Sequence, residues 1–420
     1  MSDEKIILHA DIDNFYASVA ILLNPELEGK PLIVCGDPKK RHGIVLAKNE
    51  IAKKAGIKTG DTINSAMCKI ENLIAVPPDF KKYIEYSKKV FNIYTQYTPQ
   101  VESFGLDECW LDVSGCVKLY GDGLTIAQKI KSQIKRETGL TVSIGVSFSK
   151  VFAKLGSDMK KPDAITVVSK QNYKSKVWPL KVSELLYVGR HTEEKLNKMG
   201  IYTIGELANY DMDKLIKKFG KNGYKLRQYA NGIDESEVKL YTDVHIPESV
   251  GNGTTTAQDV TNYKDASSVI FALCEIIAYR LREYGLAATV VSIALRDKNL
   301  KTITRQATLD FLTDSAFDIA SVAVTLLKNN YDFAKMPPLR SIAVSANNLM
   351  SGKDAVQQNI FEDIGKNSRM EKSIDDIRKK YGFGALRRGI TMGTVFTCDA
   401  KEVEEDFIPF DKSPKTNGEN

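Results

Sequence analysis

The chain has 420 residues, enough for about three or four domains of ordinary size, and its 59 Lys and Arg against 53 Asp and Glu give a net charge of +6. This mild basic excess favours a nucleic-acid partner only weakly over an ordinary soluble protein. No window approaches roughly 18 uninterrupted apolar residues, so no membrane span is expected. The charged N-terminus enters a strand at once and leaves no room for a signal peptide. The six cysteines lack metal-site spacing and are typical of a reduced, cytoplasmic protein.

The first acidic motif lies near the N-terminus. Residues 6–10 have the apolar character of a buried strand, and Asp11 and Asp13 stand at its end. Residues 14–23 then have helical apolar spacing. Carboxylates at the C-terminal end of a strand, followed directly by helix amides, make a natural site for a phosphate–metal complex.

The second acidic motif is the pair Asp107 and Glu108, which lies between apolar residues. Adjacent side chains on a strand point to opposite faces, so two neighbouring acids share a surface only if a tight turn intervenes. Gly105 is expected to supply that turn, between hairpin arms at 104–105 and 109–113. Like charges this close cost stability unless a cation neutralises them. Asp-Glu pairs more often lie solvated in loops, but the apolar flanks argue against a loop, and the pair predicts a metal site.

The remaining apolar pattern predicts the other elements. Strands are expected at 31–36, 43–47, 73–76, 141–146, 164–168, 250–260, 287–297, 301–309 and 338–346. Helices are expected at 49–56, 80–97, 124–136, 150–159, 266–283, 314–329 and 374–382, and 178–234 has an all-helical pattern. The order of elements up to residue 168 is typical of a ferredoxin-like fold with an insertion.

The two acidic motifs resemble the catalytic motifs of the Y-family DNA polymerases, and most closely those of its DinB, DNA polymerase IV-like branch. Residues 10–19 (ADIDNFYASV) resemble the first motif and residues 105–113 (GLDECWLDV) the second. The likeness runs in the right order from about residue 5 to about residue 390. It implies an α+β fold with a ferredoxin-like palm, a small fingers insertion, an all-helical thumb with a helix-hairpin-helix, and a C-terminal βαββαβ little finger. The implied domains are the palm (1–27 and 79–170), fingers (28–78), thumb (171–234), tether (235–247), little finger (248–350) and C-terminal tail (351–420).

The activity implied by this resemblance is template-directed, low-fidelity and distributive DNA synthesis of the translesion type, without proofreading, during repair of damaged DNA. Such transfer of a nucleotide to a primer 3′-hydroxyl uses two Mg²⁺ ions about 3.5–4 Å apart. By resemblance, Asp11 and Asp107 bridge both ions, Glu108 binds the ion at the primer terminus, and the Ile12 carbonyl binds the nucleotide ion. Asp13 faces away if Asp11 faces in.

The resemblance also implies four nucleotide-binding residues. The amides of Phe15 and Tyr16 would lie against the triphosphate, and Tyr16 matches the steric gate, whose ring fills the space that a ribose 2′-hydroxyl would need. Lys161 matches the triphosphate-binding lysine. The fourth residue is Lys53. The fingers motif usually carries Tyr and Arg where this chain has Glu50 and Lys53. A lysine cannot donate to two oxygens at once in the bidentate way that arginine does.

Each of these assignments has a structural alternative. Tyr16 could be an aromatic packed between strand and helix, and Lys161 a solvated lysine of a basic loop. Glu50 is unfavourable near a triphosphate, so we expect it to turn to solvent or to pair with a lysine that follows it. Two further departures from the family pattern are Gly105, where Ser is usual, and Tyr187, which occupies the first glycine position of the helix-hairpin-helix.

The partners implied are primer–template DNA, dNTP and the sliding clamp (β subunit), and the chain is expected to act as a monomer. Residues 357–361 (QQNIF) resemble the peptide by which bacterial polymerases bind the clamp, with Gln357, Ile360 and Phe361 at the anchoring positions.

Two other functions compete with the polymerase hypothesis. A diguanylate-type cyclase also uses a ferredoxin-like palm with two metal-bound acids, but it would lack the helix-hairpin-helix, the C-terminal domain and the clamp peptide. A non-catalytic DNA-binding protein on a decayed polymerase fold would not need Asp11, Asp107 and Glu108 intact. Primer extension with Mg²⁺ and deoxynucleotides separates all three hypotheses.

Overall fold

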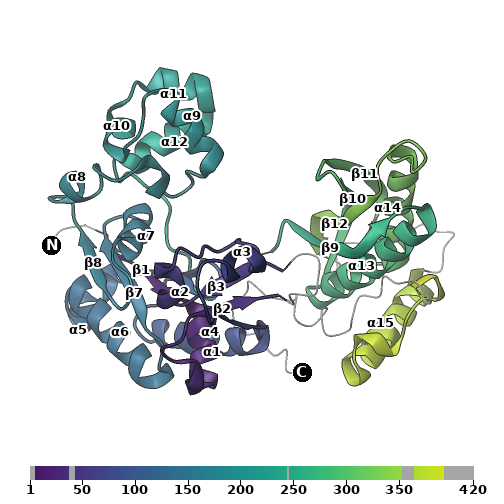
Figure 1. Ribbon diagram of the computed structural model, residues 1–420, viewed down its shortest axis with the longest axis horizontal. Helices are drawn as coiled ribbons and strands as arrows, with labels where there is room; N and C mark the ends of the chain where they lie inside the picture. Colours follow the sequence, from purple (N-terminus) through teal and green to yellow (C-terminus); the bar gives the residue numbers. More distant parts are fainter. Residues whose placement is uncertain (1–4, 37–42, 244–245, 352–363, 392–420) are drawn as a thin grey trace. The chain divides into compact units, whose positions relative to one another are not determined.

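Figure 1 shows the computed structural model of the chain, in which residues 5–36, 43–243, 246–351 and 364–391 are described. The described residues form two compact units, and each is described by itself. One contains residues 5–35 and 44–243, and the other contains Gly36, Gly43 and the described residues from 246 on. Within these described ranges no helix has both the length and the apolar character needed to cross a membrane.

A five-stranded sheet in the order β5–β6–β1–β7–β8 is the centre of the first unit. Its strands are β1 (Ile7–Ile12), β5 (Val101–Ser103), β6 (Glu108–Asp112), β7 (Val142–Ser147) and β8 (Ile165–Val168). The central strand β1 is antiparallel to both β6 and β7, and all of its residues are buried. The predicted strand at 6–10 is therefore real but too short, because ladder pairing continues through Asp11 and Ile12.

The two faces of this sheet receive different side chains because residues alternate along a strand. The helices that pack on it are α4 (Phe80–Tyr94), α6 (Gly123–Thr138) and α7 (Lys150–Met159), with the short α5 (Val117–Tyr120) before α6. Leu8, Ala10 and Ile12 pack into the core beneath α4 and α6. Ile7 packs on the opposite side, with Trp110 of β6 and Ala153 of α7. Helix α7 thus covers the face on which the odd-numbered residues of β1 lie.

A small sheet in the order β3–β2–β4 stands where the insertion is expected. It comprises β2 (Leu32–Cys35), β3 (Val45–Lys48) and β4 (Ile74–Val76), with helices α1 (Phe15–Leu23), α2 (Glu50–Lys54) and α3 (Ile63–Met67) near it in sequence. Helix α3 was not predicted, because it is only one turn long and has no complete apolar period. The helical segment that follows the large sheet contains α8 (Tyr173–Lys176), α9 (Arg190–Asn197), α10 (Ile204–Asn209), α11 (Met212–Phe219) and α12 (Lys221–Ala230).

Side-chain caps explain where several helices begin. In each case an Asp, Asn, Ser or Thr accepts a hydrogen bond from a backbone amide of the first turn, which satisfies a donor without a partner inside the helix. These caps are Asn49 (α2), Asp79 (α4), Asp122 (α6), Ser149 (α7), Thr203 (α10), Asn262 (α13) and Ser315 (α14). At α10 the cap is reciprocal, because Glu206 also accepts from the Thr203 amide.

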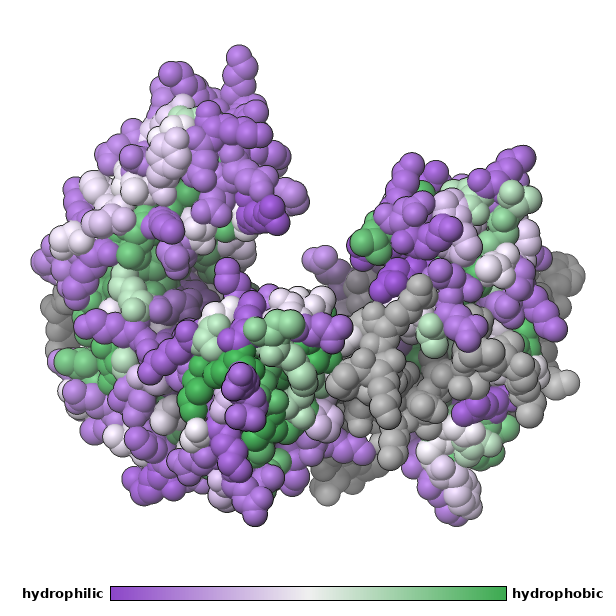
Figure 2. Space-filling model, in the orientation of Figure 1, coloured by the Kyte–Doolittle hydropathy of each residue, from purple (hydrophilic) through white to green (hydrophobic). Residues whose placement is uncertain are grey.

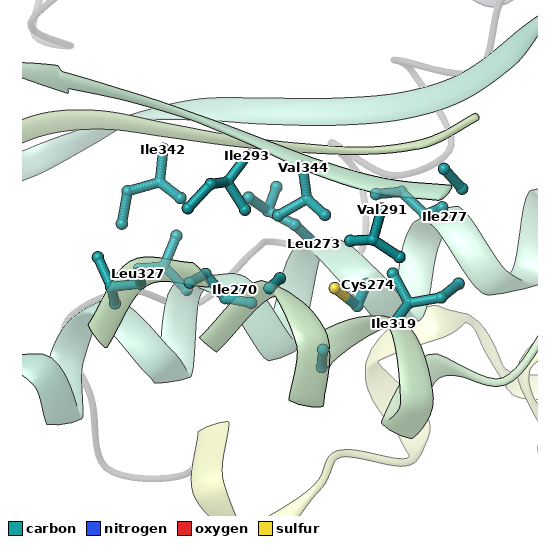
Figure 3. Close-up of a cluster of buried hydrophobic side chains, with 14 of the residues drawn as sticks. Ile270, Leu273, Cys274, Ile277, Val291, Ile293, Ile319, Leu327, Ile342 and Val344 are labelled. Carbon is teal, nitrogen blue, oxygen red and sulfur yellow. The ribbon is translucent and has the colours of Figure 1, made fainter. Parts of the chain in front are cut away.

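The second unit is a four-stranded antiparallel sheet in the order β11–β10–β12–β9 with two helices. Its elements are β9 (Ser249–Val260), α13 (Tyr263–Glu283), β10 (Leu286–Asp297), β11 (Thr302–Thr313), α14 (Ala316–Asn330) and β12 (Leu339–Ser351). This is the predicted βαββαβ order. Figure 3 shows its core, where Ile270 and Leu273 of α13 meet Ile293 of β10 and Val344 of β12.

Helix α15 (Ile364–Tyr381) packs on α13 through ion pairs. Glu275 of α13 is 4% exposed and accepts a hydrogen bond from Arg378 Nη1 at 2.7 Å and another from Arg388. Arg282 of α13 donates two hydrogen bonds to the carboxylate of Asp375, of 2.6 and 2.9 Å. The sequence predicted a shorter helix, from 374 to 382, because a helix held by charges has no apolar stripe by which its start could be found.

We predict that Glu275→Gln loosens the packing of α15. A neutral amide cannot balance the buried guanidinium of Arg378, and breaking a buried pair typically costs about 3–5 kcal/mol. Amide hydrogen exchange of the full-length protein should therefore become faster in α15. The matched control is Glu283→Gln, which removes a partly exposed pair with Lys379 at 2.7 Å and should cost no more than about 1 kcal/mol. Unchanged exchange in Glu275→Gln would contradict the prediction.

Candidate active site

The acidic residues from the two motifs meet at one end of the large sheet. Asp11 lies opposite Glu108 in the β1–β6 ladder, and the Ile12 amide donates a hydrogen bond to the Asp107 carbonyl oxygen at 3.0 Å. Gly105 has φ +90°, in the region that favours glycine, and so forms part of the turn as predicted. The turn is longer than expected and spans 104–107, because β5 ends at residue 103 and β6 already begins at Glu108.

Two lysines from the α7 side neutralise these carboxylates. Lys161 Nζ lies 2.6 Å from Asp11 Oδ2. Lys154 Nζ lies 2.9 Å from Glu108 Oε2 and 3.5 Å from Asp11 Oδ2. Asp158 contacts both ammonium groups, at 3.2 Å from Lys154 and 2.9 Å from Lys161. Crowding of like charge at the sheet edge is therefore offset by two cations from one neighbouring segment.

Helix α7 reaches the acids because it packs against β7 without an intervening side chain. A Cβ at Gly145 of β7 would lie 1.9 Å from the carbonyl oxygen of Ala153 and 2.6 Å from the amide of Ser157. Gly156 of α7 faces Gly145 in the same way, since a Cβ at Gly156 would lie 3.2 Å from the Gly145 Cα. This contact of backbone on backbone holds Lys154 directly over the ends of β1 and β6.

The two neighbouring carboxylates differ in their affinity for a proton. Burial, with the charge of Glu108 adding to it and Lys161 opposing it, raises the pKa of Asp11 to about 7. Burial also opposes ionisation of Glu108, but the contacts with His9 and Lys154 outweigh it and lower its pKa to about 2. Glu108 is therefore ionised at neutral pH, whereas Asp11 needs more positive charge nearby than the lysines supply. A cation bound beside Asp11 would favour its ionised form.

The donor set fits a hard divalent cation, since carboxylate and backbone carbonyl oxygens are the ligands that Mg²⁺ prefers. In the arrangement seen here Asp11 and Glu108 contact the two lysines instead. Among the residues that the structure describes, no group of three or more His, Cys, Asp or Glu side chains is close enough to hold a metal ion. An ion at Asp11 and Glu108 would replace ammonium contacts that already occupy these oxygens.

The sequence reasoning missed two residues of the site, His9 and Lys154. His9 is fully buried, and its Nε2 lies 3.3 Å from Glu108 Oε2 while its Nδ1 lies 2.9 Å from Ser157 Oγ. Burial lowers the pKa of His9, which favours the neutral ring. A signal existed for each: His9 stands two residues before Asp11 on the same strand face, and Lys154 follows a capped helix start at Ser149.

Asp13 is turned away from the other acids, as expected. Its Oδ1 accepts a hydrogen bond from Ser143 Oγ at 2.7 Å, and its Oδ2 accepts one from the Asp163 amide at 2.8 Å. Asp163 in turn pairs with Lys131 and Lys135 of α6 at 3.2 and 3.0 Å. Asp13 therefore anchors the loop before β8.

Tyr16 lies beside the acids in an aromatic stack. Its ring is parallel to that of Tyr83, with 4.1 Å between centroids and 9° between planes, and it meets Phe80 edge to face at 6.0 Å. Burial and then the charge of Asp107 raise the pKa of Tyr16 to about 12. The Phe15 ring is buried in the core. A rigid, half-buried ring near Asp107 is consistent with both the steric gate and the packing alternative.

The structure describes some of the remaining predicted residues and not others. Glu50 pairs with Lys53 at 3.3 Å, as expected, and also accepts a hydrogen bond from Asn14 Nδ2 at 3.2 Å. This contact ties α2 to the start of α1. Tyr187 lies in the turn before α9. Gln357, Ile360 and Phe361 fall outside the described residues.

Known proteins match this chain along most of its length. The model of the impB/mucB/samB family matches residues 10–158, that of the family's C-terminal domain residues 247–360, and that of the DNA polymerase-iota thumb domain residues 184–234. DNA polymerase IV of Acetivibrio thermocellus is 45% identical over 393 residues, which cover 93% of this chain and 98% of the relative. DNA polymerase IV of Moorella thermoacetica is 37% identical over 393 residues, which cover 93% and 97%.

A solved structure shows the same fold. The Y-family DNA polymerase chimera Dbh-Dpo4(243-245)-Dbh superposes with a TM-score of 0.74 at 24% identity, over 82% of this chain and 99% of the chimera. The sequence relatives, the family matches and this fold agree with the arrangement of the acidic motifs at the end of the sheet. The chain therefore belongs to the impB/mucB/samB family, the Y-family DNA polymerases.

Proposed function

We propose that this protein is a DNA-directed DNA polymerase of the translesion type, which transfers nucleotides from dNTPs to a primer 3′-hydroxyl on damaged templates. The observation that carries the proposal is the convergence of Asp11, Asp107 and Glu108 at one end of the sheet, in a chain 45% identical to a DNA polymerase IV. A non-catalytic protein on a decayed polymerase fold would have no reason to keep these acids together.

The proposed cofactor is a pair of Mg²⁺ ions. Asp11 and Asp107 would bridge them, Glu108 would hold the ion at the primer terminus, and the Ile12 carbonyl would hold the ion at the nucleotide. When bound, the ions neutralise charge on the phosphates and favour the deprotonated primer hydroxyl. The chain holds the donors in place beforehand: the β1–β6 ladder sets the backbone, and buried His9, 3.3 Å from Glu108, limits where that carboxylate can turn.

Lys161 is proposed to bind the triphosphate. Its side chain is 23% exposed and contacts Asp11 at 2.6 Å, so it is already within the site. Burial disfavours its charge, but Asp11 and Asp158 raise the pKa of Lys161, which stays protonated. An ammonium at this position would stabilise negative charge on the leaving phosphates. Lys53 is a weaker candidate for the same role, since its side chain is 49% exposed and paired with Glu50.

Low fidelity and lack of proofreading are part of the proposal. The insertion between β1 and α4 consists, where described, of a three-stranded sheet with short helices, which is too small for a large closing lid over the nascent base pair.

The proposed domains keep the bounds expected from the sequence: palm 1–27 and 79–170, fingers 28–78, thumb 171–234, tether 235–247, little finger 248–350 and tail 351–420.

The proposed partners are primer–template DNA, dNTP and the sliding clamp, with the chain acting as a cytoplasmic monomer. The clamp contact would use Gln357, Ile360 and Phe361. The match of the thumb-domain model to residues 184–234 supports DNA as the partner rather than the small nucleotide of a cyclase.

We predict that Asp107→Ala/Glu108→Ala abolishes primer extension. Loss of the charge that holds the cations should remove several kcal/mol of transition-state stabilisation, so the rate should fall at least about a thousandfold. The measurement is extension of a labelled primer with Mg²⁺ and dNTPs. Chelation of the metal from the wild type should give the same loss, and the thermal unfolding temperature controls for folding. Extension by the double variant at the wild-type rate would disprove the proposed active site.

For Tyr16→Ala we expect ribonucleotides to be incorporated while the use of deoxynucleotides changes little. Removal of the ring would open the space that it occupies beside Tyr83 and Phe80. The comparison is kcat/KM for ribonucleotides and deoxynucleotides in a primer-extension assay, with Tyr16→Phe as the control that keeps the ring. A Tyr16→Ala variant that excludes ribonucleotides as well as the wild type does would leave only the packing role.

Lys161→Ala should raise the KM for dNTP by about tenfold or more, because a hydrogen bond to a charged group is worth about 1.5–3 kcal/mol. Lys160→Ala is the matched control, since Lys160 is the exposed neighbour of Lys161 and directly follows the last residue of α7. Steady-state kinetics over a range of dNTP concentrations measures both variants. Equal KM values for Lys161→Ala and Lys160→Ala would show that Lys161 is only a structural partner of Asp11.

A further inference from the structure

The turn before α9 holds a tyrosine in a backbone conformation that disfavours it. Tyr187 has φ +70°. Among the described residues, the only positive-φ positions occupied by something other than Gly, Asn or Asp are Tyr187 and Leu300. The left-handed region brings a β-carbon too close to the backbone, so a large side chain there reduces stability.

Glycine would remove this strain, and the same segment uses glycine at comparable positions. Gly200, after α9, has φ +80°, and Gly220, between α11 and α12, has φ +62°. A glycine here would carry no strain. The presence of a strained tyrosine instead suggests that its side chain binds another molecule.

The ring of Tyr187 contributes little to the core of the thumb helices. Its side chain is among the exposed large ones, at 63%, while its neighbours Leu185 and Val188 are buried in the core. The ring packs against Tyr229 of α12, with 5.9 Å between centroids and 32° between planes. The two rings form an aromatic surface at the tip of the turn.

This aromatic surface continues into an open apolar cavity of about 730 Å³, which Tyr229 also lines. The cavity wall includes Ile216, Tyr224 and Ile233, and its rim carries Lys221 and Lys225 beside Asp234 and Glu235. Helices α11 and α12 together hold six basic residues (Lys214, Lys217, Lys218, Lys221, Lys225 and Arg227) and one acid (Asp213). The thumb helices accordingly show a largely hydrophilic surface in Figure 2. Aromatic rings next to lysines suit a polyanion with apolar sugars.

We propose that Tyr187, supported by Tyr229, is a DNA-contact residue of this chain, whose strained turn holds the ring against the sugar–phosphate backbone of the primer–template duplex. The ring face would pack on a deoxyribose, and the hydroxyl would donate a hydrogen bond to a phosphate. Burial and then Asp234 raise the pKa of both tyrosines, so each hydroxyl remains a neutral donor. This inference rests on the proposed polymerase function.

The test measures stability and DNA affinity in the same full-length variants. Tyr187→Gly and Tyr187→Asn both tolerate the positive φ and lack the ring. Each should raise the thermal unfolding temperature by about 2 °C and weaken the binding of a labelled primer–template duplex, followed by fluorescence anisotropy, by about tenfold. Tyr187→Phe keeps the ring and should bind within about threefold of the wild type. Tyr202→Ala removes another tyrosine of the thumb, 57% exposed, and should leave affinity unchanged.

Wild-type affinity in Tyr187→Gly and Tyr187→Asn would overturn the proposal, as would a loss of affinity in Tyr187→Phe equal to that in Tyr187→Gly. An unfolding temperature that falls in both ring-free variants would show that the tyrosine stabilises the turn, and would remove the argument from strain. Primer extension by the wild type decides the polymerase function separately. Extension by the wild type together with unchanged DNA affinity in the ring-free variants would reject only the role of Tyr187.

Discussion

The pairing of β1 with β6 is the constraint on which the first unit depends. It sets Asp11 opposite Glu108 and joins Ile12 to Asp107 by a hydrogen bond, so the acids are adjacent before any ligand binds. Carboxylates this close and this buried would destabilise the sheet if they were left alone. The fold tolerates them because Lys154 and Lys161 reach the carboxylates from the α7 side.

The same two lysines compete with metal ions for the carboxylate oxygens. They occupy the oxygens that divalent cations would need, and burial raises the pKa of Asp11 although both lysines act to lower it. Under the proposed function, a cation held by Asp11 or Glu108 would take the place of an ammonium group at these oxygens. One of these two lysines, Lys161, is the residue proposed to bind the triphosphate, so it would stabilise the protein without ligand and bind the nucleotide in the complex. His9 does not take part in the exchange, since it is fully buried and hydrogen-bonded to Ser157.

In the second unit, apolar packing and ion pairs occur in different places. Its sheet and the helices α13 and α14 enclose an apolar core (Figure 3), whereas α15 is attached to α13 by Arg–carboxylate pairs. An apolar core is insensitive to the loss of one charge, but a buried ionic network is not. The thumb helices contain a local cost of another kind. The backbone of Tyr187 is strained although its ring is exposed and not part of the core.

The sequence by itself determined the fold class and the type of most long elements, and it predicted which acids form the site. Alternation along strands and the helical period both report burial, so α7 was predicted at 150–159 and lies there, and Asp11, Asp107 and Glu108 were identified from their apolar flanks and the family motifs. Only the tertiary structure decided that His9 and Lys154 join these acids, and that α15 begins at Ile364. The reason is physical: local periodicity records which face is apolar, whereas a charge finds its partner through contacts between segments far apart in the chain.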